Sequence, residues 1–149
     1  MKIEETLLTK KIIIETEDPY GLALELMDFV SKFGKVIERE NRYETDGPFR
    51  KIILNFELVE NIDRESHSIV EFFTQGGTNH VNYLEIEIAG RFITEIAIDG
   101  IFSSAFSEYY IKHAFPRYLK ASDEKMKHLD RQITEFANSI RKQEVTKKV

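Results

Sequence analysis

The chain has 149 residues, 42% of them apolar and 32% charged, which suits one compact domain with a single core. It has no cysteine, so disulfides and thiolate metal sites are excluded and no oxidising compartment is required. The formal net charge of -5 disfavours nucleic acid as a partner, although residues 116–149 are basic, with 9 Lys and Arg against 5 Asp and Glu.

The first predicted elements are a strand and an amphipathic helix. Residues 7–16 are rich in β-branched side chains, which favour a strand. Asp18 can cap a helix whose first residue is Pro19, and Gly34 ends the segment. Between them, apolar side chains recur at helical spacing, as Leu22, Leu26, Phe29 and Phe33.

Three further strands are predicted in the first half of the chain. Residues 35–44 are polar and charged, which is typical of a strand at the edge of a sheet. In residues 50–60 apolar and polar side chains alternate, which indicates a strand with one buried face. Residues 67–75 contain β-branched and aromatic side chains and form the next predicted strand, which Gly76 and Gly77 end in a loop.

Residues 81–98 carry the clearest strand pattern. Apolar and acidic side chains alternate on both sides of Gly90. Because glycine can take the positive φ of a type II′ turn, we expect a hairpin whose two strands meet at Gly90. A single long strand that bends at Gly90 is the alternative.

Residues 101–142 are predicted to be helical. Pro116 can kink this segment, so one bent helix and two separate helices both fit the sequence. A later apolar stripe recurs at spacings of three and four, as Met126, Leu129, Ile133, Phe136 and Ile140. We expect the stripe to pack on the chain's own sheet, and a homodimer formed through this C-terminal helix is the alternative. Residues 143–149 are expected to be a disordered tail, so that residues 1–142 form the single domain.

The order of these elements predicts an α+β fold. Strands grouped between two helices favour a curved antiparallel sheet of about six strands, with an N-terminal helix after the first strand and a long C-terminal helix. The Asp18-Pro19 helix start, the strand run LEIEIAGRFITEI and the helical close FSEYYIKHAFPRYLKASDEKMKHL resemble the helix-grip superfamily of START domains and polyketide cyclases. This resemblance implies that the sheet wraps around the C-terminal helix and leaves a cavity beneath it.

A second resemblance is local. Ile88, Gly90 and Phe92 are similar to a strand pair that precedes a helix in the export chaperone SecB and its relatives. It implies a chaperone or another oligomeric interaction module with an exposed apolar groove. The two resemblances therefore imply different partners, an apolar small molecule for the first and another protein for the second.

Aromatic side chains supply the candidate binding site. If the sheet and the C-terminal helix enclose a cavity, inward-facing rings would line it, and Tyr hydroxyls or a histidine would anchor the ligand. The residues expected to do so are Phe72, Phe92, Phe102, Phe106, Tyr109, Tyr110 and His113. The alternative is that these rings simply belong to the core. The favoured function is therefore a small protein that binds an apolar molecule such as a lipid or an isoprenoid.

No sequence pattern points to a reaction, a metal or a cofactor. The four histidines are scattered, the serines lack a GxSxG turn, and no glycine-rich phosphate loop is present. We therefore expect no metal, no cofactor and no catalytic residue, and a cyclase or hydratase of helix-grip type stays open as the enzyme alternative. The acidic start MKIEETLL and the lack of a long apolar run favour a cytoplasmic protein without a leader or a transmembrane segment.

Overall fold

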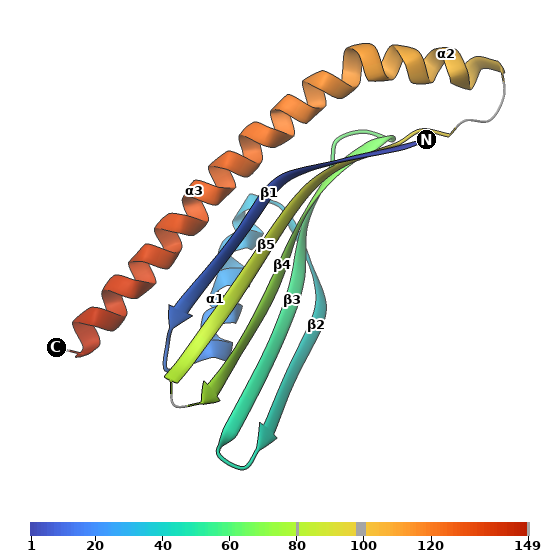
Figure 1. Cartoon of the computed structure of the whole chain (residues 1–149). Helices are drawn as coiled ribbons and strands as arrows, with labels where there is room; N and C mark the ends of the chain where they lie inside the picture. Colours follow the sequence, from blue (N-terminus) through green and yellow to red (C-terminus); the bar gives the residue numbers. More distant parts are fainter. Residues whose placement is uncertain (80, 98–100, 149) are drawn as a thin grey trace.

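The chain is an α+β protein, and its computed structural model describes the backbone of residues 1–79, 81–97 and 101–148 (Figure 1). Side chains are described for these residues apart from 46, 78, 79, 81, 101–103 and 143–148. Within this part, five strands form one sheet: β1 (Lys2–Glu15), β2 (Lys35–Asp46), β3 (Phe49–Asn61), β4 (Ser66–Asn79) and β5 (Val81–Glu95). The helices are α1 (Pro19–Val30), its 3₁₀ extension η1 (Ser31–Phe33), α2 (Ile101–Tyr109), the π-helical turn η2 (Tyr110–Ala114) and α3 (Phe115–Lys148).

The sheet is open and entirely antiparallel, with its strands in the order β1-β5-β4-β3-β2. Strands β2 to β5 follow one another as neighbours, whereas β1 pairs with the last strand, β5. The chain crosses the sheet once, through α1, to reach the far edge at β2. The prediction of an antiparallel sheet with a helix after the first strand and a long C-terminal helix is confirmed.

The predicted hairpin at Gly90 is wrong, and for this reason the sheet has five strands rather than six. Strand β5 runs without a turn through Gly90, which pairs with Leu8 on one side and Val70 on the other. A Cβ atom at this position would lie 2.7 Å from the Met126 Sδ atom and 3.0 Å from the Leu8 Cβ atom. Glycine is needed here because α3 approaches the strand closely, and the chain does not turn.

The predicted loop at Gly76 and Gly77 is also wrong, since β4 continues to Asn79. A Cβ atom at Gly76 would lie 2.7 Å from the Pro19 Cβ atom, at the start of α1. Gly76 and Gly90 therefore mark two places where a helix packs closely on the sheet, one beneath α1 and one beneath α3.

One face of the sheet carries the core. On β3, β4 and β5 the side chains that point to this face are mostly apolar and buried, and they alternate with more exposed neighbours. Helix α1 begins where it is predicted to begin, because Asp18 Oδ1 accepts a hydrogen bond from the Gly21 N–H at 3.0 Å. The buried side chains of α1 are Pro19, Leu22, Ala23, Leu26 and Val30. Those of α3 in the same core are Met126, Leu129, Ile133 and Ala137, so this stripe packs on the chain's own sheet.

The C-terminal segment is one bent helical arm rather than two separate helices. Helix α2 passes through the π-helical turn η2 into α3 without a break. The turn ends just before Pro116, which cannot donate the backbone hydrogen bond that an α-helix needs there. A π-turn accommodates the missing bond and bends the arm. Figure 1 shows α2 beyond the end of the sheet and α3 running back along β1.

Two predictions concern the tail and membranes. The backbone of α3 continues to Lys148, while the side chains of residues 143–149 lie outside the described part, so the disordered tail stays a prediction. Among the described residues, no helix is both long enough and apolar enough to cross a membrane.

Candidate functional site

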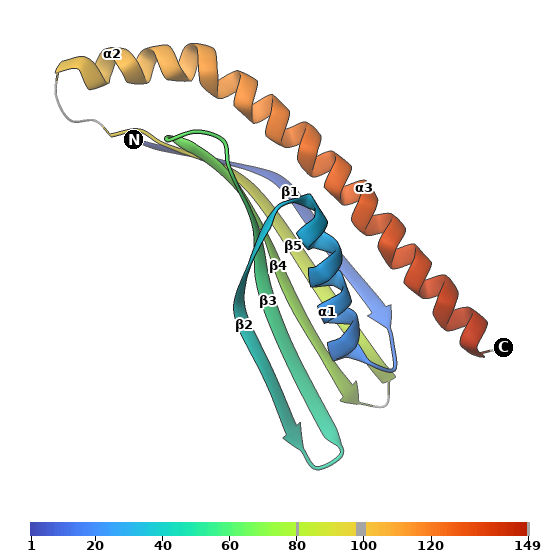
Figure 2. The same cartoon turned by 180° about the vertical axis from the view of Figure 1, so that it is seen from behind.

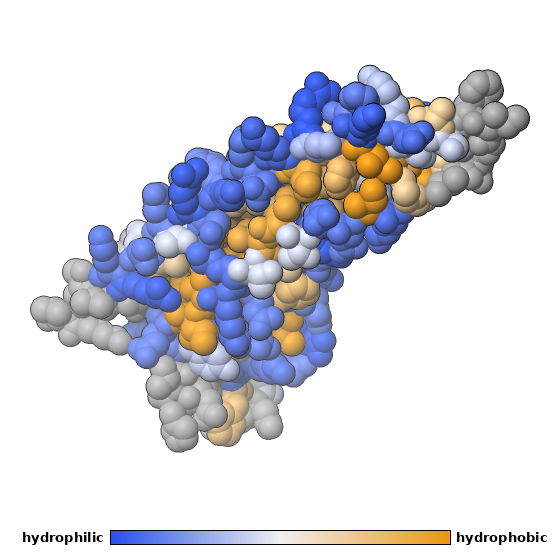
Figure 3. Space-filling view, turned by 45° about the horizontal axis from the view of Figure 1, so that its top comes forward, coloured by the Kyte–Doolittle hydropathy of each residue, from blue (hydrophilic) through white to orange (hydrophobic). Residues whose placement is uncertain are grey.

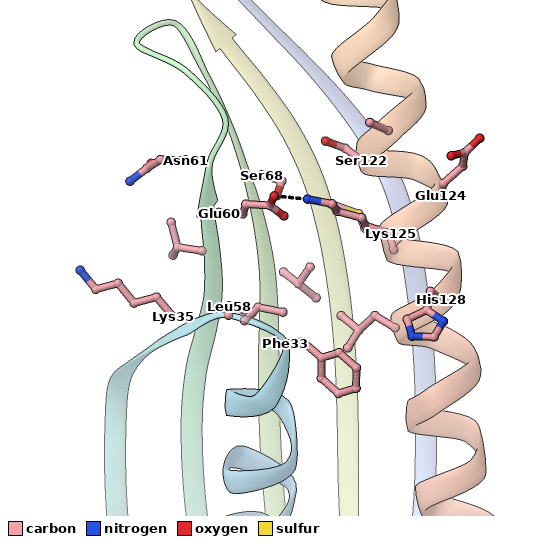
Figure 4. Close-up of a pocket in the computed structure, with 16 residues that line it drawn as sticks. Phe33, Lys35, Leu58, Glu60, Asn61, Ser68, Ser122, Glu124, Lys125 and His128 are labelled. Carbon is pink, nitrogen blue, oxygen red and sulfur yellow. Dashed lines mark hydrogen bonds and ion pairs between the residues drawn. The ribbon is translucent and has the colours of Figure 1, made fainter.

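A groove opens on the helix-covered face of the sheet, between the end of α1 and the middle of α3 (Figure 4). Its volume is about 790 Å³. We call it the α3 groove. It is lined by Phe33, Gly34, Lys35, Leu58, Val59, Glu60, Asn61, Ser68, Val70, Ala121, Ser122, Glu124, Lys125, Met126, His128 and Leu129.

The α3 groove exists because α1 is shorter than the strands it covers. Helix α1 and its extension end at Phe33, and the chain then leaves the sheet face for the edge strand β2. A Cβ atom at Gly34 would lie 3.1 Å from Leu58 Cδ1, so the chain passes tightly over β3 as it leaves. Figure 2 shows that α1 stops there while α3 continues along the β1 edge. The inner face of β3 and β4 is therefore left open beside α3.

The floor and one wall of the α3 groove are apolar. Four buried side chains contribute to them, Leu58 from β3, Val70 from β4, and Met126 and Leu129 from α3. Near the end of α1 the ring of Phe33 meets the ring of His128 edge-on, with 6.2 Å between the ring centroids. An apolar molecule placed against these side chains would remove apolar surface from water.

The opposite end of the α3 groove is polar. Lys125 of α3 donates a hydrogen bond to the Glu60 carboxylate of β3, and this ion pair crosses the groove (Figure 4). Ser68 of β4 and Ser122 of α3 are buried in the lining nearby. No described residue makes a hydrogen bond to either serine hydroxyl, and neither hydroxyl is closed off from water in the way that Ser107 Oγ is. The lining holds two lysines and two glutamates, so its formal charge is zero with histidine neutral.

The polar side chains of the α3 groove can bind and orient a ligand. His128 is exposed, and its ring contacts Phe33. Within the described part of the chain, no group of three or more His, Cys, Asp or Glu side chains could hold a metal ion. The serine hydroxyls can donate and accept hydrogen bonds, which suits the orientation of a bound molecule.

Two of the predicted site residues, Phe72 and Phe92, lie in the core. The ring of Phe72 stacks on Phe56 of β3 with 4.7 Å between centroids, and the ring of Phe92 lies 5.6 Å from that of Phe115. Both side chains are fully buried, and neither belongs to the lining of the α3 groove. A ligand could contact these rings only if the core opened.

Three other predicted residues, Phe106, Tyr109 and His113, lie on the surface of the helical arm. Phe106 is 44% exposed and Tyr109 64% exposed, and the rings of Tyr109 and His113 are 4.8 Å apart. Figure 3 shows a band of apolar surface that runs toward this end of the molecule. The side chain of Phe102 lies outside the described residues, so its role stays a prediction.

The last predicted residue, Tyr110, fixes the helical arm to the sheet through a buried hydrogen-bond chain. Its hydroxyl donates to the Asp63 carboxylate, at 3.0 Å from Oδ1 and 2.8 Å from Oδ2. Because Tyr110 has a single hydroxyl proton, Ser66 must donate to it at 2.5 Å, and Thr94 must donate to Ser66 at 2.7 Å. Burial, assisted by the hydrogen bond to Asp63, raises the pKa of Tyr110 to about 12. The phenol of Tyr110 therefore keeps its proton at neutral pH and can donate to Asp63. We call this hydrogen-bonded group of Tyr110, Asp63, Ser66 and Thr94 the Tyr110 clamp.

None of the residues that line the α3 groove was predicted as a site residue. A signal for two of them is present in the sequence. Ser68 stands two residues before Val70 in a strand whose alternate side chains are buried, and Ser122 stands four residues before Met126 on α3. A hydroxyl in line with buried apolar positions marks a polar point on an inner face. The end of the first helix follows from Gly34, but the rest of the groove depends on where that end lies against β3 and β4, which no local pattern specifies.

Comparisons with known proteins do not assign the chain to a family. No protein-family model matches it, and no curated protein matches it at a significant level. One similar structure is the solution structure of the 18 kDa protein CC1736 from Caulobacter crescentus, which is 13% identical in sequence. The match covers 87% of this chain and 98% of that chain, with a TM-score of 0.23. A similarity at this level carries no argument about fold or function.

Proposed function

We propose that this protein binds an apolar small molecule, such as a lipid or an isoprenoid, in the α3 groove between the sheet and the C-terminal helix. The observation that carries the proposal is the groove itself, whose volume is about 790 Å³. Small-molecule sites typically measure roughly 300–1,000 Å³ and are mostly apolar with a few well-placed polar groups. In this proposal the sheet and α3 work as they do in a helix-grip protein, with the helix closing one side of the ligand site.

The test is the binding of N-phenyl-naphthylamine, an uncharged dye whose fluorescence rises in apolar sites. We expect saturable binding that a lipid alcohol such as farnesol reverses. Ser122→Trp fills the groove and should abolish binding, while Ser139→Trp, on the exposed side of the same helix, should leave it unchanged. Circular dichroism checks that both variants fold. A wild-type protein that does not bind the dye, or a folded Ser122→Trp variant that binds it normally, would contradict the proposal.

A second candidate function is an oligomeric interaction module of the SecB type. The exposed rings of Phe106 and Tyr109 on the helical arm favour it, because large exposed apolar side chains that gather in one area often mark protein contacts. This function predicts that the wild-type protein is a dimer or a higher oligomer and that the Phe106→Ser, Tyr109→Ser double variant is a monomer. Light scattering measures the molar mass of both proteins, and a monomeric wild-type protein would remove this candidate.

A further inference from the structure

We infer that the ligand of the α3 groove is an uncharged amphiphile whose head carries a hydroxyl or carbonyl oxygen and lies between Ser68 and Ser122. The inference rests on the proposed binding function and adds the class of molecule and its orientation. Three features of the groove support this inference: the two serine hydroxyls, the balance of charge around them, and the apolar end of the groove that lies away from the serines.

The two serines form a polar anchor, with Ser68 on the sheet side of the groove and Ser122 on the α3 side. Ser68 on β4 is 7% exposed and Ser122 on α3 is 4% exposed, and both line the groove (Figure 4). No described residue hydrogen-bonds to either hydroxyl, and both are open to water, unlike the fully buried Ser107 Oγ. A ligand that fills the groove displaces water from these hydroxyls and must replace the hydrogen bonds that the water made. A head with an oxygen atom does so, whereas a purely apolar molecule leaves both hydroxyls unpaired.

The charges around the serines disfavour an ionic head. Lys125 already donates to Glu60 across the groove, so these two charges offset each other, and Figure 4 shows the Glu124 carboxylate pointing away from this ion pair. A carboxylate head near Lys125 would also meet Glu60, and an ammonium head near Glu60 would also meet Lys125, so repulsion would offset much of the attraction. Lys35 does not change this balance, because Figure 4 shows its side chain pointing away from Lys125. An uncharged oxygen meets no such opposition.

The apolar end of the groove sets the orientation of the ligand. Figure 4 shows Phe33 and Leu58 on the side of the groove toward the end of α1, and Ser68, Ser122 and the ion pair on the other side. The head therefore lies toward the turn between β3 and β4, and the tail lies toward η1. An amphiphile bound in this direction buries its tail against apolar side chains and keeps its oxygen at the serines.

The test compares three molecules with the same alkyl chain, decanol, decanoate and decyltrimethylammonium, as competitors of bound N-phenyl-naphthylamine at neutral pH. Because any apolar site disfavours an ion, the deciding quantity is how each affinity changes between protein variants. In the Ser68→Ala, Ser122→Ala double variant, decanol should bind about tenfold more weakly, as expected for losing hydrogen bonds to two hydroxyls. The two ions should weaken by less than about threefold, and Ser139→Ala on the exposed side of α3 should change none of the three.

The outcomes separate this inference from the function on which it rests. Dye binding that persists while decanol binds the double variant as well as the wild type overturns the inference alone. An equal loss of affinity for all three competitors also overturns it, since the serines would then shape the groove without recognising the head group of the ligand. A wild-type protein that binds neither the dye nor decanol overturns the inference and the proposed function together. Alanine is compatible with both the helix and the strand, and urea denaturation checks that the variants fold.

Discussion

The helix-covered face of the sheet has a sealed half and an open half, and both are built from the same strands. Beneath α1 the inner side chains of β3 and β4, such as Leu54, Phe56 and Phe72, are at most 1% exposed. Farther along the same strands the inner side chains Leu58 and Val70 line the α3 groove. Both sets are apolar, so residue type does not distinguish them. What distinguishes them is that α1 ends between them, which shows how the length of one helix separates a core from a site.

The sealed half should respond most strongly to a loss of side-chain volume. Phe72→Ala removes a buried ring that stacks on Phe56 and leaves a cavity, so the free energy of unfolding should fall by about 3–5 kcal/mol. The next residue, Phe73, points to the other face and is 41% exposed, and Phe73→Ala should cost less than about 1 kcal/mol. Urea denaturation followed by circular dichroism measures both. Similar losses in the two variants would mean that this half is not sealed.

The sealed half is also the part that the sequence predicts well. The alternation in β3 and the spacing of Leu22 and Leu26 in α1 follow from the periods of a strand and a helix, which decide what each element buries. The prediction fails at Gly90, because a glycine that admits a neighbouring helix and a glycine that admits a turn look alike in a sequence. The neighbour that requires glycine is Met126, which is distant in the chain.

The open half could not be predicted in the same way. The sequence predicts ligand residues from aromatic side chains at inward or helical positions, yet Phe72 is fully buried and Tyr109 is 64% exposed. The α3 groove arises from the length of α1 relative to β3 and from the path of α3 across the sheet. Both are relations between elements that are far apart in the chain, so no local pattern contains them. The sequence does show that Ser68 and Ser122 share a face with buried apolar residues, but only the structure shows that this face borders a groove.

Loss of the Tyr110 hydroxyl should have the second-largest effect on stability. This hydroxyl holds the helical arm to the sheet, and the arm continues as α3, which forms one wall of the open half. Tyr110→Phe leaves Asp63 and Ser66 without this partner, so the free energy of unfolding should fall by about 1–3 kcal/mol. Tyr109→Phe, at an exposed ring, is the matched control and should have no measurable effect. If the clamp positions the wall, Tyr110→Phe should also weaken dye binding. A destabilised variant that binds the dye normally would separate the clamp from the groove.

The same clamp predicts a loss of stability in alkali. Burial raises the pKa of Tyr110 to about 12 in the folded protein, compared with about 10 for an unperturbed tyrosine. Because the folded state holds this proton more tightly, the stabilisation is complete below pH of about 10 and is lost as the pH rises through about 12. The stability difference between the wild type and Tyr110→Phe should therefore shrink over this range, as measured by urea denaturation at a series of pH values. A difference that stays constant would show that Tyr110 does not ionise in this way.

A smaller effect is expected where α3 comes closest to the sheet. Gly90→Ala places a Cβ atom against Met126 Sδ and Leu8 Cβ, so the free energy of unfolding should fall by about 1–2 kcal/mol. Because Met126 also lines the α3 groove, the variant should change dye affinity as well. In a Met126→Ala background the cost of Gly90→Ala should be smaller, since the main clash is gone. An unchanged cost in that background would place the strain at Leu8 and not at α3.

The smallest effect on stability concerns the ion pair across the open half. Lys125 and Glu60 are both solvent-exposed, so Lys125→Met should change the free energy of unfolding by less than about 1 kcal/mol. The substitution leaves Glu60 without its partner and gives the groove a net negative charge. Decyltrimethylammonium should then compete about threefold better for the dye and decanoate about threefold worse, while decanol is unchanged.

The matched control for this charge effect is Lys127→Met on the same helix. Lys127 pairs with Asp123 at 2.9 Å and does not belong to the lining of the α3 groove, so this variant removes the same charge from the protein at a different place. If the ion pair governs the head of the ligand, only Lys125→Met shifts the competition between the two ions, and the shift persists at moderate salt because the charges are close to the head. Equal shifts in both variants that disappear at high salt would come from the overall charge, and the polar end of the open half would then contribute hydrogen bonds alone.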